Sequence, residues 1–167
     1  MNTKKVAQIG MLSSAALILH LVETWLPVPA PVPGIKLGLA NCVSLVTLAV
    51  LGIRYAFYLT VIRILLGALI GGILFGPAFV MSAAGGSGSI LAMWYASQHW
   101  KPPFSVIGVS IIGAVAHSVI QVAAAAWLVS SESLLWYVPY VVLLAIPAGA
   151  VTGLTVGYFT DRLSICR

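Results

Sequence analysis

The chain has 167 residues, of which 61% are hydrophobic, and its charged residues are 8 Lys or Arg and 3 Asp or Glu. These charged residues make up only 7% of the sequence, whereas a soluble domain carries about 25%. With a mean hydropathy of +1.11, the composition excludes a soluble globular fold and a disordered chain, and it predicts an integral membrane protein. The net charge of +5 comes from scattered residues, so we do not expect nucleic-acid binding.

Six apolar segments of about the length of a membrane-spanning helix follow one another along the chain. Turn-forming residues separate them, most clearly the Pro-rich stretch 27–34 and Lys101-Pro102-Pro103. We therefore predict an all-α fold, a polytopic membrane protein in which residues 1–167 form one compact domain of six transmembrane helices. The predicted spans, in chain order, are Val6–Leu26, Ile35–Leu51, Arg54–Gly71, Pro77–Gln98, Ser105–Val129 and Tyr137–Thr160.

The basic residues indicate how these spans are oriented. An even number of spans places both termini on the same side of the membrane, and that side would carry nearly all basic residues of the loops and tails. The opposite side would carry only Lys36. Because Lys and Arg concentrate in cytoplasmic loops, we predict that both termini are cytoplasmic. The residues on the predicted cytoplasmic side are Lys4, Lys5, Arg54, Lys101, Arg162 and Arg167.

The first two spans carry polar residues near their predicted outer ends. His20 and Glu23 share one face of the first span, Asn41 lies in the outer third of the second span, and Lys36 stands just outside it. Ionisable side chains inside a bilayer are costly and usually face the interior of the bundle. We therefore treat these four residues as candidates for a binding site.

Three further candidates lie deeper. Arg63 is nine residues into the third span, about 14 Å from its start at 1.5 Å per residue. His117 lies at a similar depth in the fifth span, and Gln121 follows one turn later on the same face. Arginine does not lose its proton, so Arg63 needs a partner.

Two main interpretations of this polar set remain open. Arg63 and Glu23 could form an internal ion pair that holds the bundle together, or the set could line an outward-opening pocket for a small molecule. A proton relay is a third alternative. Lys36, Arg63 and His117 outnumber Glu23, which favours an anionic ligand.

Small residues recur at helical spacing and predict close helix packing. Gly149, Gly153 and Gly157 lie on one face of the sixth span. In the fourth span, the glycine-rich run 83–89 weakens the helix, so it either packs closely against a neighbour or exposes backbone to a cavity.

Four stretches also carry a resemblance: 33–41, 63–67, 83–86, and 113–117 with Gln121. Together they resemble a bacterial membrane family labelled heptaprenyl diphosphate synthase component I, or Gx transporter family. That family is in turn similar to the substrate-binding S components of energy-coupling factor transporters. This resemblance implies a location in the bacterial cytoplasmic (inner) membrane and an outward-facing pocket for a nutrient. It also implies docking to a transmembrane coupling protein and two ATPases through small residues of the first helix, which here would be Ala7, Met11 and Ala15.

The two family labels imply different functions. Prenyl chain elongation uses clustered aspartates to hold Mg²⁺ on the diphosphate, and this chain has a single aspartate, Asp161. We therefore expect that the chain is not itself catalytic. It has no Cys/His spacing typical of a metal site, and we expect no cofactor. The first hypothesis is a subunit that binds a small anionic nutrient for uptake, and the alternative is a non-catalytic membrane partner of a prenyl synthase.

Overall fold

The fold is helical throughout the part of the chain that the structure describes. The computed structural model describes residues 3–25, 40–99 and 105–165, and in these ranges it contains no strand. This confirms the predicted all-α class and the predicted number of α-helices. In chain order the elements are α1 (Thr3–Trp25), α2 (Asn41–Leu51), α3 (Ile53–Ile70), α4 (Pro77–His99), α5 (Val106–Val129), the 3₁₀ helix η1 (Glu132–Tyr137) and α6 (Val138–Ile165).

Among the described residues, three stretches are long and apolar enough to cross a membrane, namely Ile53–Ile70, Val106–Val129 and Glu132–Tyr158. The helix α2 has only 11 residues, so it rises about 16 Å, roughly half of the 30 Å hydrocarbon core. The apolar part of α1 is also shorter, at Ala7–Glu23. The structure therefore supports a membrane protein, while six complete crossings stay a prediction.

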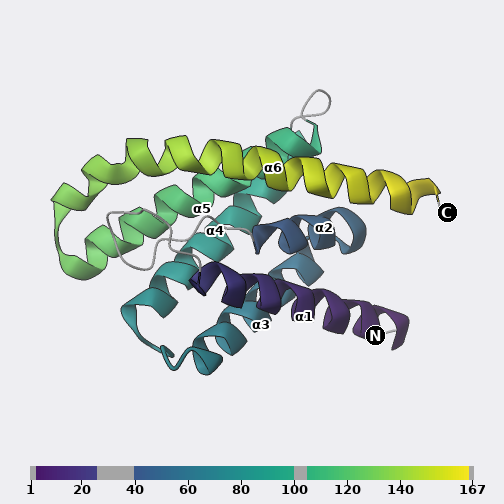
Figure 1. Cartoon of the computed structure of the whole chain (residues 1–167), viewed down its shortest axis with the longest axis horizontal. Coiled ribbons are helices and arrows are strands. Elements are labelled where there is room, and N and C mark those ends of the chain that lie inside the picture. The colour runs from purple at the N-terminus through teal and green to yellow at the C-terminus, as the bar shows by residue number, and fades with distance from the viewer. Residues whose placement is uncertain (1–2, 26–39, 100–104, 166–167) are drawn as a thin grey trace.

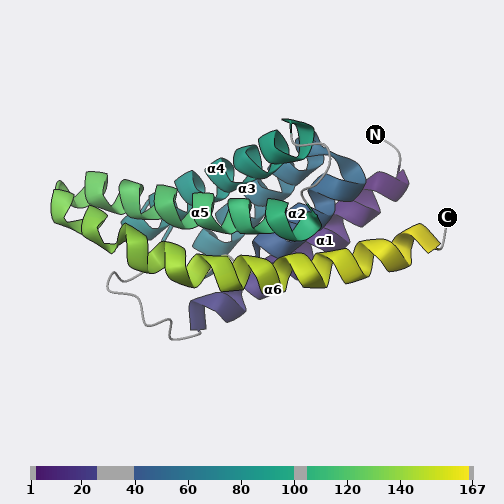
Figure 2. The ribbon, with the colours of Figure 1, turned by 90° about the horizontal axis from the view of Figure 1, so that it is seen from above.

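The helices form one bundle, in which α5 makes the largest contacts. It packs most extensively against α6 and α4, whereas α1 packs on α3 and α2. Figures 1 and 2 show that the start of α1 and the end of α6 lie at one end of the bundle, and that the α5–α6 connection lies at the other end. The side of the membrane on which these two helix ends lie stays a prediction.

Glycines let α5 and α6 approach closely. A Cβ atom added at Gly149 would lie 2.7 Å from Cα of Ile111, and one added at Gly153 would lie 2.6 Å from Cα of Ile107. Ser110 and Thr152 join the same two helices through a hydroxyl–hydroxyl hydrogen bond of 2.8 Å. At Gly157, the third glycine of the predicted packing face, an added Cβ would meet no described atom within 4 Å. The close contact therefore includes Gly149 and Gly153 but ends before Gly157.

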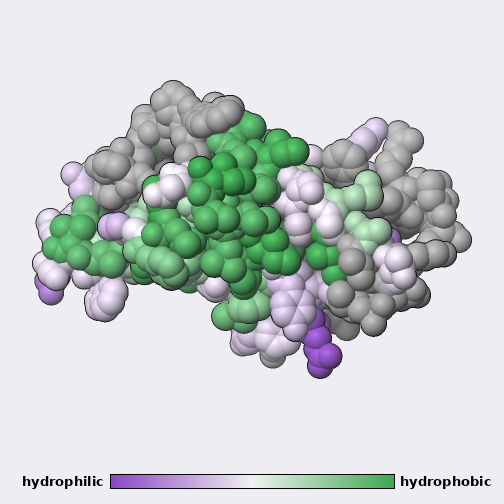
Figure 3. Space-filling model, turned by 90° about the horizontal axis from the view of Figure 1, so that it is seen from below, coloured by the Kyte–Doolittle hydropathy of each residue, from purple (hydrophilic) through white to green (hydrophobic). Residues whose placement is uncertain are grey.

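Large apolar side chains cover the outside of the bundle. Met11 is 75% exposed, Trp127 77% and Trp136 86%. Figure 3 shows apolar residues gathered across the middle of one face of the molecule. A soluble protein rarely exposes so large an apolar area, whereas a surface in contact with lipid tails requires it.

Candidate ligand-binding site

Arg63 lies on the inward face of α3. Thr60 and Gly67 flank it at helical spacing and are also buried, whereas Ile62 and Leu65 are exposed. The buried face of α3 therefore carries its polar residues Thr60 and Arg63 beside the apolar residues Leu59 and Ile64. This pattern places the guanidinium of Arg63, a residue only 3% exposed, inside the bundle.

Four helices meet at this guanidinium. Nη2 of Arg63 donates a hydrogen bond of 3.5 Å to Oδ1 of Asn41 at the start of α2. Glu23 near the end of α1, itself 3% exposed, acts electrostatically on Arg63. From α4, Gly86 approaches so closely that an added Cβ would lie 3.4 Å from Nη2. The structure thus brings Glu23, Asn41 and Arg63 together, as both interpretations of the polar set require.

Two donors in this cluster have no acceptor within the described ranges. Nε of Arg63 and Nδ2 of Asn41 are buried and have no hydrogen-bond partner among the described residues. A buried polar group left in this state costs about 1–3 kcal/mol. Since most buried polar groups in native proteins are satisfied, two such neighbours need an explanation. A ligand that supplies acceptor oxygens would provide one.

Two imidazole rings extend the polar cluster. The ring of His117 on α5 lies against α4, where a Cβ added at Gly85 would be 3.3 Å from its Nδ1. The ring of His20 on α1 lies against α3, where a Cβ added at Gly67 would be 2.6 Å from its Cδ2. Glycines in α3 and α4 therefore make room for each polar group. Gln121, one turn beyond His117, is fully buried.

The other predicted site residues lie elsewhere. Lys36 is outside the described residues. Ala7, Met11 and Ala15 are exposed along α1, so they are accessible to another protein or to lipid.

Sequence reasoning missed several buried hydroxyl groups. Ser44 on α2 and Thr60 on α3 are fully buried and form a hydrogen bond of 3.2 Å. Oγ of Ser13 on α1 is buried without a partner in the described ranges. Nothing in the sequence distinguished these residues from the many other serines and threonines. The only signal for Ser44 and Thr60 is that each lies three residues from Asn41 or Arg63 on the same helix.

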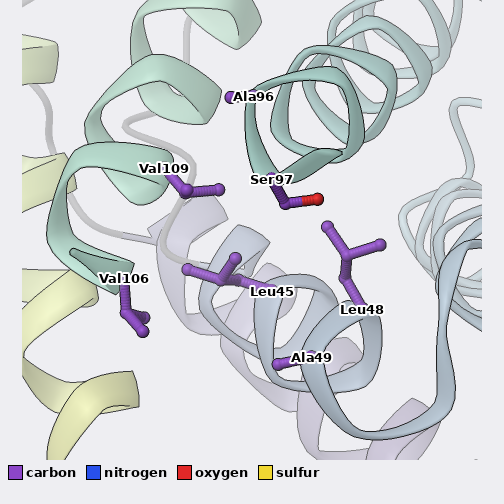
Figure 4. A pocket seen from close by; sticks show the side chains of 7 residues that line it. All are labelled: Leu45, Leu48, Ala49, Ala96, Ser97, Val106 and Val109. Atoms are coloured by element: carbon purple, nitrogen blue, oxygen red, sulfur yellow. The ribbon is translucent and has the colours of Figure 1, made fainter. Parts of the chain in front are cut away.

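The described residues also form two pockets away from the cluster. One, of about 230 Å³, lies between α2, α4 and α5 near the opposite end of α2. Figure 4 shows Leu45, Leu48 and Ser97 around its space. The other, of about 460 Å³, lies at the corner between α5 and η1 and includes Trp127 and Glu132. The polar cluster itself is closed, because its charged and amide side chains are almost fully buried.

The described part of the chain holds no group of three His, Cys, Asp or Glu side chains that could bind a metal ion. Fold and cluster thus define a class: an all-helical protein with membrane-crossing helices and a buried polar centre. The chain belongs to the heptaprenyl diphosphate synthase component I family, whose model matches residues 12–159. This match includes all the cluster residues described above. No curated protein and no solved structure matches the chain.

Proposed function

We propose that this protein is a non-catalytic membrane subunit that binds a small anionic molecule for uptake across the membrane. The binding site would be the Arg63 cluster, which consists of His20, Glu23, Asn41, Arg63 and His117. One observation carries the proposal: Nε of Arg63 and Nδ2 of Asn41 are buried donors without acceptors among the described residues. A purely structural cluster would be expected to satisfy its donors. An anionic ligand supplies acceptor oxygens and favours a guanidinium as its partner.

The division of the cluster among helices suits a site that opens and closes. His20 and Glu23 belong to α1, whereas Asn41, Arg63 and His117 belong to α2, α3 and α5. A displacement of α1 would therefore expose Arg63 and Asn41 without breaking the closely packed α5–α6 pair. In this proposal the ligand enters from outside and leaves inside when partner proteins drive the movement. The exposed residues Ala7, Met11 and Ala15 would dock a coupling protein that works with ATPases.

The experiment is an analysis of the small molecules that the purified protein retains. The protein is extracted in mild detergent, denatured, and the released molecules are identified by liquid chromatography and mass spectrometry. We expect a molecule that accompanies the wild-type protein and is lost from Arg63→Gln. The control is Arg54→Gln, which changes the same residue type at the exposed start of α3. Equal retention by Arg63→Gln would contradict the assignment of the site.

The family's description favours a second candidate. A heptaprenyl diphosphate synthase component I suggests a chain that works with a separate synthase subunit. In that case this protein would present a lipid-like substrate to a soluble catalytic partner, since its single aspartate, Asp161, does not make a Mg²⁺–diphosphate site. Copurification discriminates the two candidates: a prenyl synthase bound to the protein favours the second, and an ATPase with a membrane coupling protein favours the first.

A further inference from the structure

The two donors without an acceptor in the described part of the chain flank a single contact. Oδ1 of Asn41, which accepts from Nη2 of Arg63, shares its amide carbon with the unpartnered Nδ2. Nη2 in turn shares the guanidinium carbon with the unpartnered Nε. Nδ2 and Nε are therefore each two covalent bonds away from one of the two atoms that form this hydrogen bond. A ligand group with two oxygens on one atom could reach both donors.

The local charge limits how many negative charges this ligand group can carry. Glu23 and Arg63 are each 3% exposed, and Glu23 already acts electrostatically on Arg63. Together they contribute no net charge. A carboxylate would add one negative charge, whereas phosphate adds up to two and diphosphate more. Buried charge that is not balanced is costly, and no described metal-binding group is present to offset it.

The space beside the guanidinium is also narrow. The backbone of α4 passes so close that a Cβ at Gly86 would be 3.4 Å from Nη2 of Arg63 and 2.9 Å from Cδ1 of Ile64. A planar carboxylate can lie in the plane of the guanidinium and accept from its edge. A tetrahedral phosphate projects oxygens out of that plane.

We propose that the anionic group recognised by this site is a single carboxylate, held by Nε of Arg63 and Nδ2 of Asn41, and not a phosphate or diphosphate. This proposal rests on the proposed function, because it names the ligand class of the same site. It also separates the two candidate functions, since a prenyl diphosphate does not meet the description.

The test uses the molecule that the wild-type protein retains and Arg63→Gln loses. Fragmentation in the mass spectrometer distinguishes the two classes: carboxylates lose carbon dioxide or formic acid, and phosphates release phosphate anions. A carboxylate without phosphorus supports the proposal. A phosphorylated molecule overturns it while leaving the proposed function intact. If no molecule depends on Arg63, the proposed function itself fails.

A variant tests the geometry separately. Asn41→Asp replaces the donor Nδ2 with a carboxylate oxygen and still accepts from Arg63. We expect the amount of ligand retained per folded protein to fall at least about tenfold, because the new carboxylate offers no N–H donor and adds a negative charge beside the anionic ligand. The control, Ser133→Asp, adds the same charge on exposed η1. Unchanged retention by Asn41→Asp would overturn the assigned role of Nδ2.

Discussion

The α5–α6 contact and the Arg63 cluster are both built around glycines, but the glycines do different things. At Gly149 and Gly153, the atom nearest to a missing Cβ is a backbone Cα atom of α5. At Gly67, Gly85 and Gly86, they include the polar ends of His20, His117 and Arg63. In the first region the missing side chain brings two backbones together. In the second it leaves room for polar groups that would otherwise not fit inside the bundle.

The two regions also differ in how completely their polar atoms are satisfied. Ser110 and Thr152 hydrogen bond to each other across α5 and α6, whereas Nε of Arg63 and Nδ2 of Asn41 have no described partner. This difference suggests that the α5–α6 contact serves stability and that the Arg63 cluster serves binding.

The largest effect on stability is expected from Glu23→Gln. It removes the negative charge that acts on Arg63, so the buried guanidinium loses the carboxylate that balances its charge. This loss should lower the free energy of unfolding by about 3 kcal/mol or more. Unfolding in mixed micelles with increasing SDS measures the change. The control is Glu132→Gln, an exposed acid on η1, which should have no effect. Equal stability of the two variants would show that Arg63 does not depend on Glu23.

The second prediction concerns the glycines of α6. Gly153→Ala places a methyl group 2.6 Å from Cα of Ile107, and backbone atoms move only with the whole helix. We expect a loss of about 1–3 kcal/mol in the free energy of unfolding. Gly157→Ala is the matched control, because an added Cβ there meets no described atom within 4 Å. Equal free energies of unfolding for Gly153→Ala and Gly157→Ala would contradict the close α5–α6 contact at Gly153.

The third prediction separates stability from binding at α4. A Cβ at Gly86 would meet side-chain ends, at 2.9 Å from Cδ1 of Ile64, 3.2 Å from Cγ2 of Thr60 and 3.4 Å from Nη2 of Arg63. Such ends can shift, so Gly86→Ala should change the free energy of unfolding by less than about 1 kcal/mol. The retained ligand should nevertheless decrease several-fold, as measured by mass spectrometry. Gly10→Ala, where an added Cβ has no described neighbour within 4 Å, should retain the wild-type amount.

The smallest effect is expected at the hydroxyl pair. Interhelical hydrogen bonds inside membranes contribute about 0.6 kcal/mol on average. Ser110→Ala should therefore destabilise the protein by roughly that amount and leave ligand retention unchanged. A double-mutant cycle with Thr152→Val isolates the coupling between the two hydroxyls. A coupling energy near zero would show that their bond of 2.8 Å adds nothing to the α5–α6 contact.

The order and number of the α-helices could be predicted from hydropathy, because each long apolar run needs a helix to satisfy its backbone in lipid. The first and last residues of the helices are predicted less accurately. The predicted span Tyr137–Thr160 is α6 from Val138 to Ile165, preceded by the 3₁₀ helix η1. Pro147 lies inside α6 without ending it. Hydropathy does not detect such details, since apolar character changes little across a short 3₁₀ turn or a tolerated proline.

The polar residues of the cluster were identifiable from their rarity in apolar spans, but their contacts were not. The sequence left open whether the glycines of α4 line a cavity or pack closely. The structure shows close packing, with His117 against Gly85 and Arg63 against Gly86. The hydrogen bond from Arg63 to Asn41 joins residues 22 positions apart. Such pairings depend on the relative rotation and height of several helices, which the spacing within one helix does not fix.

The most direct test of a ligand-binding Arg63 cluster is native mass spectrometry of the intact protein released from lipid nanodiscs. We predict a wild-type mass equal to that of the polypeptide plus one small molecule, and a bare polypeptide mass for Arg63→Gln. Arg54→Gln should keep the bound molecule. A wild-type protein that carries no bound molecule, or an Arg63→Gln variant that keeps it, would contradict the account.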